Sequence, residues 1–153
     1  MKRLTVIIIL VLAAGMVLRA QDAKHDKTAK EYIGDLSSSG DEKVLLEAAK
    51  FLGDKKEKDA VPGLINLLTD KRENVRIESA VSLGLIAEES SVDALNTAMI
   101  NDESAEVRYA SILATMRIGS KKSIEAYKQM KDKETDPFIQ DILKKMEEKM
   151  KGK

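Results

Sequence analysis

The stretch that decides the fold reads AVPGLINLLTDKRENVRIESAVSLG and covers residues 60–84. In its first part, residues 60–68, apolar side chains recur at i, i+3, i+6 and i+7, which places them on one stripe of a helix. Residues 74–84 form a second apolar helical pattern, and the polar run at residues 70–73 separates the two. The stretch therefore predicts two helices joined by a short turn.

Both halves of this stretch recur along the chain. Residues 44–53 match residues 75–84 at an offset of 31, a third copy begins at Val107, 32 positions further on, and residues 136–143 form a weaker fourth copy. The first half recurs at residues 91–99, and its apolar theme returns at Tyr32, Ile33, Leu36, Ile124, Tyr127 and Met130. One helix pair cannot bury its apolar stripe alone, whereas stacked pairs bury a continuous core. We therefore expect an all-α solenoid of about four antiparallel helix pairs over residues 28–150.

The composition excludes several classes of function. The chain has no cysteine, which removes disulfides, thiolate metal sites and cysteine nucleophiles. Its 26 basic and 26 acidic side chains leave no excess of positive charge for binding nucleic acid. Because the sequence also lacks a glycine-rich phosphate loop, a Ser-His-Asp set and a metal-ligand cluster, it predicts no cofactor, no metal and no catalytic residues.

The first twenty residues have the pattern of a secretory signal. The chain begins with Met1-Lys2-Arg3, continues with an almost purely apolar run at residues 4–18, and reaches a small residue at Ala20. A membrane-spanning helix usually needs about 20 apolar residues, so this run is short. We expect a cleaved signal peptide, and an uncleaved inner-membrane anchor is the alternative.

This expectation sets the domain boundaries and the compartment. We expect a signal peptide at residues 1–20, a linker at 21–27, the repeat domain at 28–150 and a tail at 151–153. The protein would then be periplasmic or secreted. Removing the three basic residues of the signal from the total leaves 23 basic against 26 acidic side chains, so the mature chain is slightly acidic.

The stretch quoted above resembles HEAT repeats and, more narrowly, the short bacterial HEAT-like type named after phycobilisome lyases. The resemblance is strong over residues 58–119, fair over 28–54 and weak over 121–150. It implies a right-handed superhelix of the armadillo type. It implies a fold more than a function, because such repeats serve as scaffolds in many unrelated settings.

Two enzyme families are similar in fold. Deoxyhypusine hydroxylases carry His-Glu pairs that bind two irons, whereas this sequence has a single histidine, His25. Phycobilin lyases act on cyanobacterial pigment proteins, which an exported chain would not meet. We therefore expect that the chain is not an enzyme.

Two acid–arginine pairs recur at repeat positions. Asp70 with Arg76, and Asp102 with Arg108, share a spacing of six. The resemblance to HEAT-like repeats implies a structural ladder, in which the acid and the arginine form hydrogen bonds along the stack. A site for an anion at the two arginines is the alternative.

Other positions carry simpler expectations. Leu45 takes the arginine position in the first pair, and Phe138 or Ile139 takes it in the last, so the ladder is expected only in the two central pairs. Gly53 and Gly84 predict close approach of neighbouring helices more than approach of a ligand. Of the methionines, we expect Met99, Met116 and Met130 in the core, and Met146 and Met150 as a cap on it or as an adaptable contact surface.

By resemblance to the family, the second helix of each pair lines the inner curve of the solenoid. These helices are expected at residues 42–52, 74–87, 105–118 and 137–150. The residues expected to face a partner from them are Lys50, Glu78, Ser82, Tyr109, Ser111 and Thr115. Tyr109 is the best candidate, because tyrosine offers a large contact area with little entropy to lose. Packing of Tyr109 on the neighbouring pair is the alternative.

Together these observations predict an exported, non-catalytic scaffold or adaptor that binds a protein or peptide. We expect no nucleic-acid partner and no membrane contact beyond the N-terminal segment. The alternatives are an accessory domain of an envelope enzyme complex and a membrane-tethered structural protein of the envelope. The sequence predicts neither the identity of the partner nor the oligomeric state.

Overall fold

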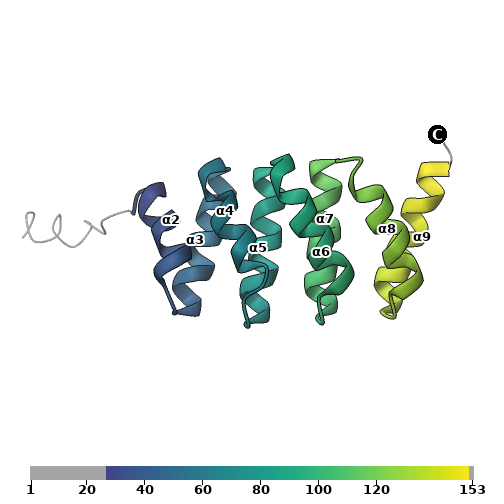
Figure 1. Cartoon of the computed structure of the whole chain (residues 1–153), viewed down its shortest axis with the longest axis horizontal. Helices are drawn as coiled ribbons and strands as arrows, with labels where there is room; N and C mark the ends of the chain where they lie inside the picture. The colour runs from purple at the N-terminus through teal and green to yellow at the C-terminus, as the bar shows by residue number, and fades with distance from the viewer. Residues whose placement is uncertain (1–26, 152–153) are drawn as a thin grey trace, which may run out of the picture.

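The structure is a computed structural model that describes residues 27–151, with side chains as far as Glu148. Within these residues the chain contains eight α-helices, two short 3-10 helices and no strand, and it forms an all-α solenoid (Figure 1). The helices are α2 (Ala29–Ser38), α3 (Glu42–Lys55), α4 (Val61–Leu67), α5 (Glu73–Ile86), α6 (Val92–Asn101), α7 (Ala105–Ile118), α8 (Ser123–Lys133) and α9 (Pro137–Lys151). The expected signal peptide and most of the linker lie outside the described residues.

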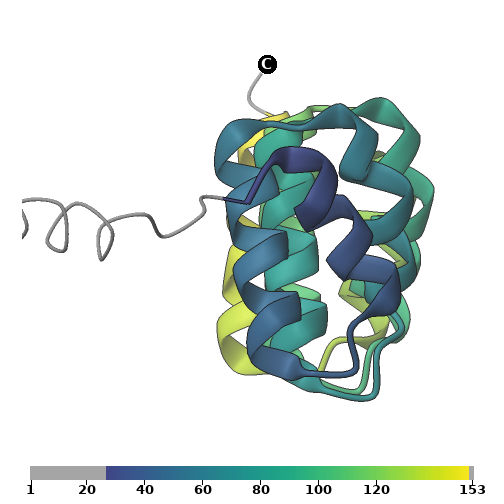
Figure 2. The same cartoon turned by 90° about the vertical axis from the view of Figure 1, so that its left-hand side faces the viewer.

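The helices form two layers. In Figure 1 the first helix of each pair, α2, α4, α6 and α8, lies toward the viewer, and the second helices α3, α5, α7 and α9 lie behind. The end-on view in Figure 2 shows the layers side by side, with α2 in one and α3 in the other. Within the second layer, α5 packs against α3 on one side and α7 on the other. The predicted four antiparallel pairs are therefore confirmed.

Local sequence signals start the second helices. The Asp41 side chain accepts a hydrogen bond from the backbone N–H of Val44 at the start of α3. Ser104 does the same for Val107 at the start of α7. Such caps satisfy backbone donors that have no partner inside the helix. These two second helices therefore begin at a fixed residue, which sets the register of their outward-facing side chains.

Small residues set the spacing between second helices. A Cβ atom added to Gly84 would lie 2.7 Å from the Cα atom of Ala114, and one added to Gly53 would lie 2.7 Å from the Oγ atom of Ser82. These distances are too short for real carbon contacts, so only glycine allows the helices to lie this close. The predicted close approach at Gly53 and Gly84 is confirmed.

The core runs along the whole stack between the two layers. A large cluster joins α2 to α7, and a second one, at the C-terminal end, includes Met99, Met130 and Leu143. Two of the three expected core methionines, Met99 and Met130, are buried, and the half-buried Met146 packs against the second cluster. The expectation for Met116 is wrong, since its side chain is 47% exposed. It lies three residues after the exposed Leu113 and therefore shares that side of α7. The side chain of Met150 is outside the described ones.

Candidate functional site

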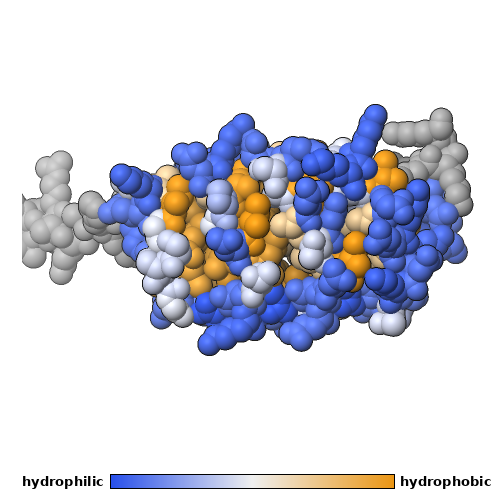
Figure 3. All heavy atoms as spheres, viewed as in Figure 1, coloured by the Kyte–Doolittle hydropathy of each residue, from blue (hydrophilic) through white to orange (hydrophobic). Residues whose placement is uncertain are grey.

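A groove of about 800 Å³ lies in the first-helix layer, between α4 and α6. The two helices that flank it differ in length, with 7 residues in α4 and 10 in α6. Ile65, Leu68, Ala94 and Ala98 supply its apolar lining, and Asn66, Thr69, Thr97 and Asn101 supply its neutral polar side chains. Figure 3 shows this layer from outside, with apolar side chains visible between mostly hydrophilic ones.

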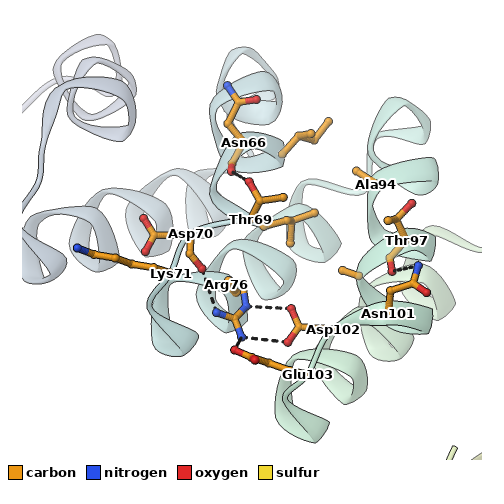
Figure 4. A pocket seen from close by; sticks show the side chains of 13 residues that line it. Asn66, Thr69, Asp70, Lys71, Arg76, Ala94, Thr97, Asn101, Asp102 and Glu103 are labelled. Carbon is orange, nitrogen blue, oxygen red and sulfur yellow. Dashed lines mark hydrogen bonds and ion pairs between the residues drawn. The ribbon is translucent and has the colours of Figure 1, made fainter.

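The charged lining of the groove consists of the exposed Lys71 and of a buried arginine with its partners (Figure 4). The Arg76 Nε and Nη2 atoms donate to the two carboxylate oxygens of Asp102, at 2.9 Å and 3.0 Å, and Nη2 also lies 3.5 Å from a carboxylate oxygen of Glu103. Its Nη1 atom donates to the backbone carbonyl of Asp70 at 2.9 Å. Arg76 is only 6% exposed. Its guanidinium is thus engaged by the protein itself, which favours a structural role over an anion site.

The same arrangement repeats one pair further along. The Arg108 Nη1 atom donates to the backbone carbonyl of Asp102 at 3.0 Å, and its Nε and Nη2 atoms donate to the two carboxylate oxygens of Glu134, at 2.8 Å and 2.7 Å. Each arginine therefore joins the turn of its own pair to the acid of the next pair. Within one pair, the arginine donates to the backbone carbonyl of the acidic residue. The carboxylate of that acidic residue accepts hydrogen bonds from the arginine of the preceding pair.

The ladder is longer than the sequence predicted. In the last pair, the Gln140 side chain donates to the backbone carbonyl of Glu134 at 2.6 Å, so Gln140 takes the arginine position that we assigned to Phe138 or Ile139. At the other end, Arg72 forms a two-point pair with Asp70, at 2.8 Å for each contact, and donates to the backbone carbonyl of Gly40 at 2.7 Å. The ladder thus reaches all four turns rather than the central two.

These contacts shift the ionisation of the acids. The side-chain hydrogen bond from Arg72 lowers the pKa of Asp70 to about 2. The Arg108 guanidinium likewise holds the pKa of the buried Glu134 carboxyl below its usual value. Hydrogen bonds to carboxylates raise the pKa values of Arg76 and Arg108. The ladder therefore consists of charged partners at neutral pH.

The six residues expected to face a partner divide into two groups. Lys50 is exposed on α3, and Glu78 is half-buried beside it, where burial raises the pKa of the Glu78 carboxyl. Tyr109 is also half-buried, and its ring makes an edge contact with Phe138, with centroids 5.3 Å apart. Tyr109 therefore packs on the neighbouring pair, which was the alternative to a partner-facing role, and part of its surface stays exposed.

Three of the six positions are wrong, because the structure buries them. The Ser82 hydroxyl donates to the backbone carbonyl of Ala49 at 2.8 Å, in the close contact between α3 and α5. Ser111 is fully buried. Thr115 is 1% exposed, donates to the backbone carbonyl of Ser111 and accepts from the Tyr127 hydroxyl at 2.9 Å. The second helices α3, α5 and α7 pack against neighbours in their own layer and against the first layer, so only a narrow strip of each remains free.

That strip carries apolar side chains that the sequence analysis did not select. Val81 on α5, Leu113 and Met116 on α7, and Phe138 on α9 are 40%, 44%, 47% and 59% exposed. Val81 and Leu113 occupy the same repeat position, 32 residues apart. The offset between the repeats, applied to every apolar residue of the second helices, could have identified this pair. We call these four residues the apolar strip.

Comparison with known proteins identifies the repeats. A family model described as HEAT repeats matches residues 30–114, which is more than half of the chain. The deoxyhypusine hydroxylase of Saccharomyces cerevisiae (strain ATCC 204508 / S288c) is 37% identical over 103 residues, covering 65% of this chain and 31% of that protein. The chain thus spans about a third of the length of this curated relative. Since the relative is an enzyme, the expectation that the chain is not an enzyme is overturned.

The described residues do not fit a histidine–glutamate iron centre of the hydroxylase type. Within residues 27–151, no group of three or more histidine, cysteine, aspartate or glutamate side chains could hold a metal ion. The chain's single histidine, His25, lies outside the described part. Among the described helices, none is long and apolar enough to cross a membrane. What the matched segments share is the repeat architecture, and on the family match the chain belongs to the HEAT-repeat family.

Proposed function

We propose that this protein is an exported scaffold that binds a protein or peptide through the apolar strip of its second-helix layer. One observation carries the proposal: three consecutive second helices, α5, α7 and α9, each expose at least one large apolar side chain. HEAT repeats suit such a role because a stack of helices offers an extended, rigid surface. Large apolar side chains that gather on a surface mark interaction sites, whereas single ones need no explanation.

The members of the apolar strip are neighbours. Val81 and Leu113 lie at equivalent positions of α5 and α7, which pack directly against each other. Met116 follows Leu113 by three residues, on the same side of the helix. Phe138 of α9 is connected to the part of the strip on α7 by the half-buried Tyr109, whose ring contacts the Phe138 ring. The strip therefore offers one apolar surface across three pairs.

The export part of the proposal is supported by the N-terminal sequence alone. A basic start, an apolar run and a small residue at Ala20 support a signal peptide. N-terminal sequencing of the protein from its native host tests this. Mature protein that begins near Gln21 outside the cytosol supports export, and full-length protein in the cytosol contradicts it.

The surface is tested by capture of partners from the exported fraction with matched variants. Leu113→Asp places a charge in the apolar strip, and Thr97→Glu places the same charge on the exposed side of α6. We expect Leu113→Asp to abolish the capture of partners that the unmodified chain retains, and Thr97→Glu to leave it unchanged. The reverse pattern would assign binding to the groove between α4 and α6 and contradict the proposal.

A second candidate, hydroxylation of a deoxyhypusine-bearing protein, rests on the 37% identity to the yeast hydroxylase. The test is the iron content of the full chain after reconstitution with ferrous iron. Stoichiometric iron together with hydroxylation of such a protein would establish this activity. A chain that retains no iron would show that the identity reflects shared repeats.

A further inference from the structure

The surface along α7 carries an acid at one end and a base at the other. Glu106 lies in the first turn of α7 and Arg117 in its last turn, and both are exposed. They are 11 residues apart, which corresponds to roughly 16 Å along a helix. Leu113 lies on the same stripe between them, since positions separated by four or seven residues share a helix face. The apolar strip is thus bounded by opposite charges along the helix direction.

The acidic end is reinforced by the neighbouring helix. The Ser104 hydroxyl donates to the Glu73 carboxylate at 2.6 Å and lies 3.0 Å from a carboxylate oxygen of Glu106. One side chain thus holds the first-turn acids of α5 and α7 together. At the basic end, the Arg117 guanidinium has no hydrogen-bond or ion-pair partner within the described part of the chain. It is available to an acid from outside.

Between these ends α5 and α7 lie close together. A Cβ atom added to Gly84 would lie 2.7 Å from the Cα atom of Ala114, so the two helices are in direct contact there. Val81 and Leu113 are the exposed apolar side chains at the same repeat position of these two adjacent helices. Two parallel helices with apolar side chains at matching positions suit a helix laid lengthwise, whose apolar residues recur at i, i+3, i+4 and i+7.

We propose that the partner is an amphipathic helix of another protein, docked lengthwise between α5 and α7. Its apolar stripe contacts Val81 and Leu113. A basic residue at one end faces Glu73 and Glu106, and an acidic residue about three turns away faces Arg117. This inference rests on the proposed function, since it names the class of partner for the same surface.

Three synthetic amphipathic peptides of about 14 residues test the charge pattern. They share one apolar stripe and carry Lys at one end and Glu at the other, Lys at both ends, or Glu at both ends. With the full chain we expect the Lys/Glu peptide, which matches both ends, to bind about threefold more tightly than the Lys/Lys and Glu/Glu peptides, each of which matches one end. The differences should shrink in 1 M salt, where the screening length is about 3 Å.

The Arg117→Glu variant changes the expected order. Its surface is acidic at both ends, so the Lys/Lys peptide should become the tightest, while its circular dichroism spectrum stays that of the parent chain. Equal affinities of the three peptides, or binding of none, would overturn the inference. So would self-association of the chain that Leu113→Asp abolishes, because a second copy would then cover the surface.

The two proposals can fail separately. If Leu113→Asp abolishes partner capture and the peptides do not differ, the charge pattern is wrong and the binding surface stands. If Thr97→Glu abolishes capture and Leu113→Asp does not, the binding surface itself is wrong.

Discussion

Between α4 and α6 a buried arginine contacts acidic side chains, whereas on the outer side of α5 and α7 large apolar side chains face solvent. Arg76 in the groove has a partner for each of its three nitrogen atoms. Val81 and Leu113 on the opposite layer are 40% and 44% exposed. The groove is therefore built for cohesion, and the surface over α5 and α7 is left for a partner. A cavity by itself is a weaker sign of binding here than an apolar surface with nothing on it.

The largest expected effect comes from the arginine whose partner is most buried. Arg108→Ala leaves the Glu134 carboxylate, which is 1% exposed, without its guanidinium. Removing one partner of a buried pair typically costs about 3–5 kcal/mol. Urea denaturation should show this loss, and Arg117→Ala at the exposed end of the same helix serves as the control. Equal stability of the two variants would contradict the structural role of the ladder.

Next in size is the close contact between α5 and α7. Gly84→Ala places a methyl group against the Ala114 backbone, whereas Gly34→Ala on α2 meets nothing within 4 Å. We expect Gly84→Ala to lose about 2–3 kcal/mol through overpacking. Gly34→Ala should gain a few tenths to about 1 kcal/mol through helix propensity. Thermal unfolding of both variants measures the contrast, and a stabilised Gly84→Ala would refute the contact.

The acid dependence of stability tests the ladder at its N-terminal side. Arg72 lowers the folded-state pKa of Asp70 from 3.8 to about 2. A lowered folded-state pKa contributes stability that is complete above the unfolded-state pKa and is lost as the pH falls through the folded-state value. As the pH falls from 5 to 2, the free energy of unfolding of the parent chain should decrease by up to about 2 kcal/mol more than that of Asp70→Asn. If stability depended on pH in the same way in both chains, the proposed stabilisation by the Asp70–Arg72 ion pair would be contradicted.

The smallest expected change in stability lies on the second-helix layer. Leu113→Asp alters a side chain that is 44% exposed, so the free energy of unfolding should change by no more than about 0.5 kcal/mol. Denaturation of the purified variant measures this change. A large loss of stability would mean that Leu113 supports the core rather than a partner, and the capture experiment would then need Val81→Asp in its place.

The sequence predicted the architecture because the helical apolar pattern recurs along the chain, with an offset of 31 to 32 residues between successive copies. It also predicted the arginines of the ladder from their repeat spacing. Glu134 was missed, because the arginine position six residues later holds Gln140 and the pair looks broken. Ser82, Ser111 and Thr115 were misplaced, because a second helix is covered on three sides and periodicity does not show how narrow its free strip is. The groove was missed as well, since its lining residues come from two different pairs.

Hydrogen exchange of the complex with a captured partner tests the central claim most directly. We expect slower exchange of backbone amides at residues 77–85 of α5 and 106–117 of α7 in the complex than in the free chain. Residues 65–71 and 94–103, which line the groove in the first-helix layer, should exchange at the same rate in both. Protection confined to the groove, with α5 and α7 unchanged, would contradict the account.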